Sequence, residues 1–258
     1  MIQQERLIKT VEYLKANQTA TLAELARLTE VSIDTARRDL GQLEAQGMLK
    51  RVRGGAVYHQ RELDVQVPFE VRQDGTPEAK REIASQLGAF IVDGQSVLLN
   101  SGTTNMEIAS FLVKNYTHLT VLTNNLYVLD ILAQAKKFIT IVPGGIVDVA
   151  EGAIWGDQCE RDLMQYNIDT AILSPDAISL EKGITGFHPA QASVVRMMMQ
   201  ISKRKIFVAE HTKFDRTAWV NICGVDEIGA VISDSGLSED VCEAYEKRGV
   251  TVVVPDRK

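Results

Sequence analysis

The chain has 258 residues, of which 45% are apolar and 24% are charged, and its formal net charge is −6. This length predicts one large domain or two, and the composition excludes a disordered chain, a coiled coil and a collagen-like repeat. No apolar run approaches the ~18 residues of a membrane-spanning helix. Three widely spaced cysteines predict neither a disulfide framework nor a thiolate zinc site. We expect a cytoplasmic protein without a metal site or a cofactor.

The charge is divided unevenly along the chain. Residues 1–60 contain nine basic and seven acidic side chains, a net charge of +2, and the remainder carries −8. Within the first block, residues 45–61 contain four basic side chains and no acidic one. Such asymmetry points to nucleic acid, although a short basic run is also typical of a solvated surface.

The first sixty residues begin with two predicted helices. Leu7, Val11 and Leu14 recur at helical spacing and predict a first amphipathic helix. Thr21 precedes a second, short helix with Glu24 in its first turn.

Ser32 is a natural N-cap for a third helix. The core stripe that we predict for this helix consists of Ile33, Ala36, Leu40 and Leu43. Short polar side chains and arginines occupy the other face, namely Asp34, Thr35, Arg37, Arg38 and Gln42. Such a face near the start of an exposed helix suits docking in the major groove of DNA.

Residues 48–58 alternate apolar and polar side chains around Gly54-Gly55, which predicts a β-hairpin. A hairpin directly after the third helix is the wing of a winged helix-turn-helix. Its basic side chains would meet DNA phosphates, which contribute affinity without sequence information. The alternative is a module for protein interaction built from the same three helices and hairpin.

The segment TLAELARLTEVSIDTARRDLGQLEAQGMLKRVRGGAVYH resembles the N-terminal signature of the DeoR family of bacterial transcriptional repressors. The resemblance covers residues 3–60, and RRDL, LxxxG and RxxGGA follow one another at the family's spacing. It implies a repressor that binds operator DNA. The residues that we expect to contact DNA are Ser32, Asp34, Thr35, Arg37, Arg38, Lys50, Arg51 and Arg53.

Within this set, Asp34, Thr35 and Arg38 are expected to read bases, and the other basic residues to hold phosphates. One winged helix buries too little surface to be selective, whereas a two-fold pair reads two half-sites. We therefore expect a homo-oligomer, a dimer or tetramer, on an operator with repeated or palindromic half-sites.

The domain boundaries follow from local composition. We predict a DNA-binding domain over 1–60, a linker over 61–76 and an effector-sensing domain over 77–258. The linker has no sustained period, and Thr76 as N-cap with Pro77 at the first helical position opens the next helix.

Short apolar runs alternate with helical patterns through the second domain. Strands are predicted at residues 96–99, 119–122, 138–142, 170–173, 205–209, 230–233 and 251–254. Strand–helix alternation predicts a doubly wound, mostly parallel α/β fold with helices on both faces of the sheet.

Ligands of such sheets bind beyond the carboxyl ends of the strands. Three consecutive loops there consist of small polar residues and glycine: Asn100, Ser101, Gly102, Thr103, Thr104, Thr123, Asn124, Asn125, Gly144 and Gly145. Such loops suit a phosphorylated, hydroxyl-rich ligand. Each taken singly is also an ordinary turn, and Thr104 with Glu107 fits a capping box whether or not phosphate binds.

Lys213 follows a predicted strand end and would supply a point charge for phosphate, unless it is an ordinary solvated lysine. The segments LLNSGTTNMEIA, VLTNNL, VPGG, AEHTKF and DEIGAVISD resemble the sensor domain of the same family. That domain is related in fold to ribose-5-phosphate isomerase, glucosamine-6-phosphate deaminase and coenzyme A transferases. The resemblance implies a phosphorylated sugar as effector, with Asp176 in a plausible ligand position.

Three segments depart from the family pattern. Asn100 replaces the usual aspartate before GTT, and Ser174-Pro175-Asp176-Ala177 replaces Gly-Ala-Asp-Gly. Ser193 and Val195 stand where a glutamate and a lysine are common. The pocket has therefore lost charged groups around Asp176.

Sugar isomerisation or deamination needs a positioned acid–base pair. Asp176 lacks the glutamate that could partner it, and His118, His188 and His211 form no sequence constellation. No GxSxG, HExxH or Walker motif occurs. We expect no catalytic residue and no enzyme activity. The alternative is a sugar-phosphate isomerase or deaminase that carries a fused DNA-binding module.

Overall fold

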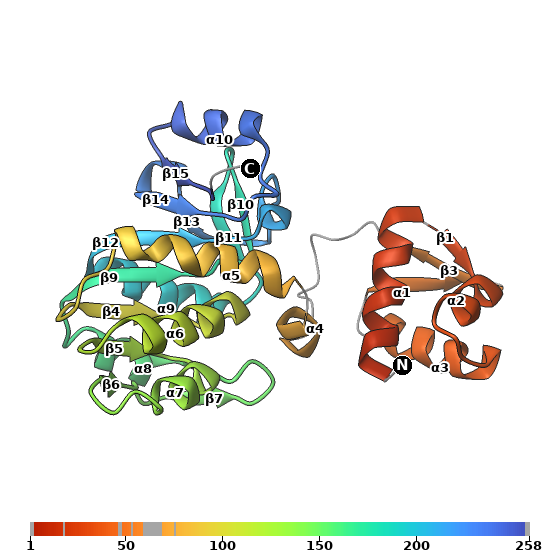
Figure 1. Cartoon of the computed structure of the whole chain (residues 1–258), viewed down its shortest axis with the longest axis horizontal. Helices are drawn as coiled ribbons and strands as arrows, with labels where there is room; N and C mark the ends of the chain where they lie inside the picture. The colour runs from red at the N-terminus through yellow and green to blue at the C-terminus, as the bar shows by residue number, and fades with distance from the viewer. Residues whose placement is uncertain are drawn as a thin grey trace. The chain divides into compact units, whose positions relative to one another are not determined.

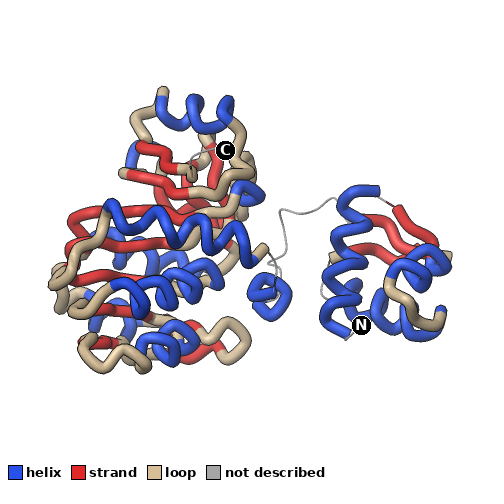
Figure 2. The backbone as a smooth tube through the Cα atoms, viewed as in Figure 1, coloured by secondary structure: helices blue, strands red, loops and turns tan. Residues whose placement is uncertain are grey.

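The computed structural model of the protein describes residues 3–17, 19–45, 48–52, 54–58, 69–74 and 76–255. The chain divides into two units, Met1–Gly75 and Thr76–Lys258 (Figures 1 and 2). Each unit has its own apolar core. None of the described helices is long and apolar enough to cross a membrane.

The first unit contains the three predicted helices and the predicted hairpin. Its elements are α1 (Gln3–Asn17), β1 (Thr19–Thr21), α2 (Leu22–Leu28), α3 (Ile33–Ala45), β2 (Leu49–Val52), β3 (Gly55–Tyr58) and α4 (Phe69–Asp74). The strands form an antiparallel sheet in the order β1-β3-β2. Strand β1, which no sequence pattern indicates, pairs with the inner strand of the hairpin, so β2 is an outer strand of this sheet.

The core of the first unit forms where the helical stripes meet. Leu14 of α1, Leu25 of α2 and Leu43 of α3 are each no more than 1% exposed. One predicted core residue is wrong: Ile33 is 49% exposed. It is the first residue of α3, so it lies at the end of the stripe, beyond the part of the helix that its neighbours cover.

Local hydrogen bonds set where two of these helices begin. The Thr21 hydroxyl accepts from the backbone of Glu24, whose carboxylate accepts from the backbone of Thr21, so the two residues form a capping box. These bonds from Thr21 also lower the pKa of Glu24. The Ser32 hydroxyl accepts from the backbone N–H of Thr35 at 3.2 Å, which confirms Ser32 as the cap of α3.

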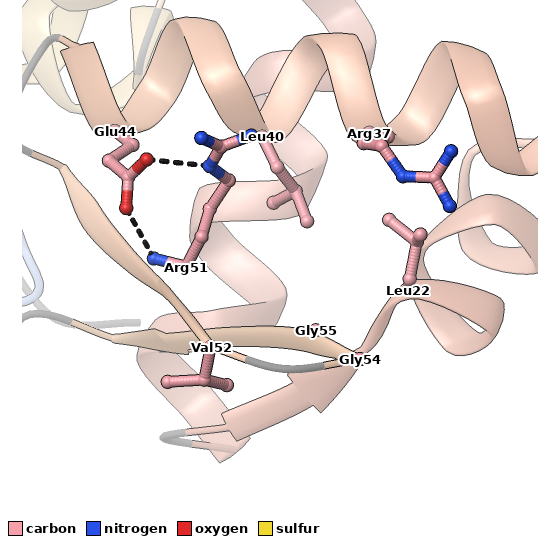
Figure 3. A pocket seen from close by; sticks show the side chains of 8 residues that line it. All are labelled: Leu22, Arg37, Leu40, Glu44, Arg51, Val52, Gly54 and Gly55. Atoms are coloured by element: carbon pink, nitrogen blue, oxygen red, sulfur yellow. Dashed lines mark hydrogen bonds and ion pairs between the residues drawn. The ribbon is translucent and has the colours of Figure 1, made fainter.

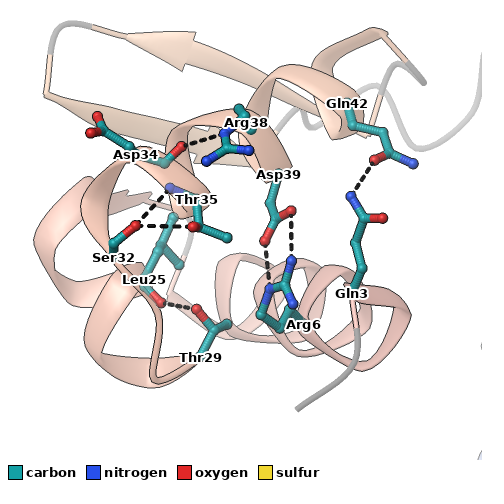
Figure 4. A network of polar contacts seen from close by, with 10 residues as sticks. All are labelled: Gln3, Arg6, Leu25, Thr29, Ser32, Asp34, Thr35, Arg38, Asp39 and Gln42. Carbon is teal, nitrogen blue, oxygen red and sulfur yellow. Dashed lines mark hydrogen bonds and ion pairs between the residues drawn. The ribbon is translucent and has the colours of Figure 1, made fainter.

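A largely buried ion pair fastens α3 to α1 (Figure 4). Arg6 donates from Nε to Asp39 Oδ2 at 2.8 Å and from Nη2 to Asp39 Oδ1 at 3.2 Å. The two side chains are only 12% and 5% exposed. Each of the two N–H groups binds its own carboxylate oxygen. The pair therefore fixes the rotation of α3 about its own axis as well as its distance from α1.

The predicted linker over residues 61–76 contains a short helix. Residues 61–68 lie outside the described residues, but Phe69–Asp74 form helix α4, with the Arg72 guanidinium 5.6 Å from the centre of the Phe69 ring. Thr76 does precede α5 (Pro77–Ser85), yet its side chain makes no capping bond. It has left-handed backbone angles (φ 48°, ψ 51°), and its hydroxyl donates to Glu210 instead.

The second unit is built on a seven-stranded parallel sheet, which confirms the predicted α/β class. The strands are β4 (Ser96–Leu99), β5 (Thr120–Thr123), β6 (Ile139–Ile141), β9 (Ile168–Leu173), β12 (Ser202–Val208), β14 (Ala230–Ile232) and β15 (Thr251–Val253). Their order is β15-β14-β12-β9-β4-β5-β6. The chain therefore starts in the middle of the sheet, runs outward to β6, and returns to β9 to fill the other half.

Helices cover both faces of the sheet. Val97 and Leu99 of β4 share one core cluster with α5, α6 (Thr103–Asn115) and α7 (Leu126–Leu132), whereas Leu98 belongs to a second cluster with α8 (Asp157–Leu163) and α9 (Pro189–Gln200). This alternation is what a strand buried on both sides requires. Met198 and Met199 of α9 lie in the second cluster, so they are core residues.

Two smaller sheets follow the main strands and have no clear sequence signal. A hairpin of β7 (Ile146–Asp148) and β8 (Ala153–Trp155) follows β6. An antiparallel sheet of β10 (Ala177–Ser179), β11 (Gly183–Gly186) and β13 (Val220–Cys223) follows β9 and β12. The remaining helices are η1 (Gln86–Ala89), η2 (His211–Lys213), η3 (Val225–Glu227) and α10 (Glu239–Glu246).

The Arg6→Ala variant should destabilise the first unit by about 3 kcal/mol, because it leaves the buried carboxylate of Asp39 without its partner. Hydrogen exchange of the α3 amides in the full chain would show the loss as easier opening of that helix. Arg37→Ala is the control: it removes an ion pair whose side chains are 59% and 77% exposed, so it should cost less than about 1 kcal/mol. Equal protection of α3 in both variants would contradict this role of Arg6.

Candidate functional site

The outer face of α3 carries the residues that were expected to read DNA. Asp34, Arg37 and Arg38 are exposed, and Thr35 is half-buried behind its contact with Ser32. Arg37 Nη1 lies 2.7 Å from Asp34 Oδ1, and Arg38 Nε donates to the Asp34 backbone carbonyl at 3.4 Å (Figure 4 shows Asp34, Thr35 and Arg38). Exposed contacts of this kind are weak, so both arginines can exchange them for contacts with a nucleic acid.

The wing lies beside the second half of α3 and leaves a groove of about 370 Å³ between them (Figure 3). The groove is lined by Leu22, Arg37, Leu40, Glu44, Arg51, Val52, Gly54 and Gly55. Arg51 crosses it and donates from Nε to Glu44 Oε2 at 2.6 Å. Arg53 and the Lys50 side chain, also expected to hold phosphates, lie outside the described residues.

The candidate ligand site begins at the carboxyl ends of β4 and β9, the neighbouring strands between which the chain reverses its direction across the sheet. Asn100 joins the two ends: its Nδ2 donates to the Ser174 carbonyl at 3.1 Å, and its Oδ1 accepts from the Ser174 N–H at 2.7 Å. An aspartate could not make the first of these bonds, because an ionised carboxylate has no proton to donate.

Asn105 in the first turn of α6 completes this junction, and sequence reasoning missed it. It is fully buried and donates to the Asn100 carbonyl at 2.9 Å and to Asn100 Oδ1 at 2.8 Å, with a longer bond of 3.2 Å to the Ile172 carbonyl. The only sequence signal for Asn105 was its amide side chain, two residues after Thr103. Its role depends on β9, which lies 67 residues further along the chain.

The loop after β5 is tied to the loop after β4. Asn124 Oδ1 accepts from the Ser101 N–H at 3.0 Å, and Asn125 Nδ2 donates to Ser101 Oγ at 3.2 Å. Asn125 Oδ1 also caps α7, and Thr123 Oγ1 accepts from the Asn125 N–H. These three residues are buried, so their polar groups hold the loops in place, whereas Ser101 is half-exposed.

Gly102 is a buried glycine that precedes α6 as its N-cap. Gly102 has φ 154°, and a Cβ there would lie 2.9 Å from the Ser174 side chain, so only glycine fits this approach. The capping box expected for Thr104 and Glu107 is wrong: Gly102 is the cap, and no side chain caps the helix. The first backbone N–H groups of α6, including that of Thr103, therefore have no capping side chain.

Gly144 and Gly145, in the third predicted loop, contact α8 and the β7–β8 hairpin respectively. The Gly144 N–H donates to Asp162 Oδ2 at 2.7 Å, and a Cβ on Gly145 would lie 2.5 Å from the Trp155 carbonyl oxygen. A carboxylate beside the Gly144 amide disfavours an anion there. The structure therefore gives this loop a clear packing role.

Asp176 and Lys213 stand on segments that run side by side. Ile178 and Phe214 form a β-bridge, and the Arg216 N–H donates to the Ile178 carbonyl at 3.2 Å. Asp176 and Lys213 are both half-buried at the carboxyl edge of the sheet, and Asp176 Oδ2 accepts from the Phe187 N–H at 3.1 Å.

The loops after β12 and β14 are joined by a histidine–aspartate pair that sequence reasoning missed. His211 Nδ1 lies 2.6 Å from Asp234 Oδ2, and the His211 backbone N–H donates to Asp234 Oδ1 at 2.7 Å. Asp234 is 3% exposed. Two further bonds tie these loops to α5, from Thr76 to Glu210 and from the Ser235 N–H to Glu82. The loop of Lys213 is thereby fastened to the helix that follows the linker.

Two of the three cysteines, Cys159 and Cys223, are buried. Burial raises the pKa of Cys159 and of Cys223 to about 12. Both side chains are therefore protonated and unreactive at neutral pH.

Two family models match the chain. Residues 6–62 match the model described as "DeoR-like helix-turn-helix domain", and residues 76–235 match "DeoR C terminal sensor domain". The HTH-type transcriptional repressor GlcR of Bacillus subtilis (strain 168) is 31% identical over 100% of this chain and 98% of its own length. The glycerol-3-phosphate regulon repressor of Escherichia coli (strain K12) is 29% identical over 91% of this chain and 92% of its own.

A solved structure of D-ribose-5-phosphate isomerase in complex with phospho-erythronic acid is also similar to this chain. The similarity has a TM-score of 0.40 at 13% identity and covers 53% of each chain. A score at this level supports no conclusion about activity.

The Asn100→Asp variant should destabilise the second unit by roughly 1–3 kcal/mol, since a carboxylate oxygen would then face the Ser174 carbonyl. Urea unfolding followed by the fluorescence of Trp155 and Trp219 measures this change. Asn167→Asp makes the same chemical change at an exposed position and should stay within about 0.5 kcal/mol of the wild type. A loss no larger than that of the control would show that the Asn100 bond to Ser174 is dispensable.

Proposed function

Because the chain belongs to the DeoR family of transcriptional regulators, we propose that it represses a carbohydrate operon and leaves its operator when a phosphorylated sugar binds. The observation that carries the proposal is the pairing of two units in one chain. An exposed polar helix beside a wing comes first, and a sheet with clustered polar loops follows.

The first unit supports DNA binding through the shape of α3. Its buried face is fixed by Leu40, Leu43 and the Asp39 pair, so the opposite face has a defined orientation. We assign base reading to Asp34, Thr35 and Arg38, and phosphate contact to Arg37 and the basic residues of the wing. Two copies of the chain on two half-sites would supply the selectivity that one small unit lacks.

The second unit supports recognition of a phosphorylated, hydroxyl-rich metabolite. The uncapped N-terminus of α6 suits the phosphate, with Lys213 as a cation, and Ser101 and Asp176 suit hydroxyl groups. The relative from E. coli K12 is named for a regulon of glycerol 3-phosphate, which agrees with this class of effector. Occupancy would act on the linker through the Thr76–Glu210 contact.

The alternative of an isomerase or deaminase fused to a DNA-binding module is not favoured. The full-length relatives described above are named as repressors. One oxygen of Asp176, the candidate base, already accepts a backbone N–H, and the positions where family members carry a glutamate and a lysine hold Ser193 and Val195. We propose a cytoplasmic regulator without catalytic activity.

Arg38→Ala should reduce discrimination between operator and random DNA by about 1–3 kcal/mol, because base contacts and not phosphate contacts carry sequence information. The operator is first selected from a random duplex pool by repeated binding to the wild type. Affinities for the selected and random duplexes are then compared at one salt concentration. Arg27→Ala on α2 removes the same charge from an exposed position and is the control. Equal weakening on both duplexes would contradict base reading by Arg38.

Lys213→Ala should leave operator affinity unchanged and abolish release by the effector. A thermal-shift screen of sugar phosphates identifies the effector, since a ligand at 100 times its Kd stabilises the folded state by about 2.7 kcal/mol. Lys247→Ala, which changes an exposed lysine directly after α10, is the matched control. An unchanged response of Lys213→Ala would remove this lysine from the site, and turnover of a sugar phosphate by the wild type would favour the enzyme alternative.

A further inference from the structure

The groove between α3 and the wing contains one acidic side chain that DNA contact does not explain. Glu44 lies in the last turns of α3, next to a surface expected to face phosphates, where a carboxylate repels DNA. It is part of an ion pair with Arg51, and the two side chains are 35% and 46% exposed.

Both oxygens of Glu44 bind the same partner (Figure 3). Oε2 accepts from Arg51 Nε at 2.6 Å, and Oε1 accepts from the Arg51 backbone N–H at 2.8 Å. Strand β2 is an outer strand of its sheet, so this amide has no strand partner on that side. The carboxylate therefore holds the strand and the side chain of Arg51 together.

This geometry leaves the far end of the guanidinium available. Glu44 takes the Nε edge, and Nη1 lies against α3, 3.6 Å from where a Cβ on Gly41 would stand. The small residue at this point lets the planar group lie along the helix, and the fork of two Nη groups is the part that recognises a phosphate. Among the described residues, no hydrogen bond to either Nη group of Arg51 is present.

We propose that Glu44 is a positioning residue for DNA binding: it holds Arg51 in the orientation in which the arginine contacts a phosphate of the duplex. A long side chain such as Arg51 loses rotational entropy when it binds a phosphate. Because Glu44 already restricts Arg51 in the free protein, less entropy is lost when DNA binds. The opposite role would be competition, in which Glu44 withholds Arg51 from DNA. Positioning is favoured because the two bonds from Arg51 to Glu44 come from Nε and the backbone N–H, not from the phosphate-binding fork.

The inference rests on the proposed DNA-binding function, and its test uses a random-sequence duplex because phosphate contacts do not depend on sequence. Affinities and their salt dependence are measured for the full-length wild type, Glu44→Ala, Arg51→Ala and the double variant. Glu44→Ala should weaken binding about fivefold, and Arg51→Ala should weaken it at least as much and reduce the salt slope by about 0.9. In the Arg51→Ala background, Glu44→Ala should have no further effect.

Two controls separate positioning from charge and from folding. Glu12→Gln removes an acidic charge from an exposed position of α1 and measures the effect of net charge on DNA affinity. Glu44→Gln retains one acceptor oxygen for Arg51 without the charge, and should recover part of the affinity that Glu44→Ala loses.

Three results would overturn the proposal. Tighter binding by Glu44→Ala than by Glu12→Gln would show that Glu44 competes with DNA. An equal loss with and without Arg51 would show a general role in folding of the wing, and unchanged binding by Arg51→Ala would show that this arginine does not contact phosphate. A wild type that binds no duplex at all would instead overturn the proposed function itself.

Discussion

The hydrogen bonds between Asn100 and Ser174 are the contact on which the second unit depends. They join β4 to β9, the two strands from which the chain leaves toward opposite edges of the sheet. Loops diverge at such a point, and the space between them is where ligands of doubly wound sheets bind. Asn105 and Gly102 support the same junction, so the candidate ligand loops share one scaffold of amide side chains and close backbone contacts.

In the first unit, a small number of contacts fixes the orientation of α3 and of the wing. A helix that reads DNA, which is the role we propose for α3, must expose one face and still be held rigidly. The apolar stripe packs α3 against the core, and the Arg6–Asp39 pair fixes the rotation of the helix about its axis. Glu44 binds the wing to the end of the same helix. The polar groups that remain on the outer face can then exchange weak contacts within the protein for contacts with DNA.

Much of the architecture was predictable because its signals are local. All seven strands of the main sheet follow from short apolar runs, since strands buried on both faces need apolar side chains in succession. Strand β1, the two small sheets and the helix α4 were missed because each is short, and β1 and β13 also pair with strands distant in the sequence. Ile33 was misassigned because periodicity gives the direction of a side chain but not whether a neighbouring element covers it.

The candidate site shows the same division. The sequence by itself determined the family resemblance, the two-domain order and the polar loops at the strand ends, because these depend on residue type and spacing. Only the tertiary structure decided which of those polar groups are used within the protein: Asn100, Asn124 and Asn125 bind neighbouring loops, and the Gly144 amide binds Asp162. It also paired His211 with Asp234 and Glu44 with Arg51. Hydrogen bonds between residues distant in sequence depend on backbone packing, which residue type and spacing do not specify.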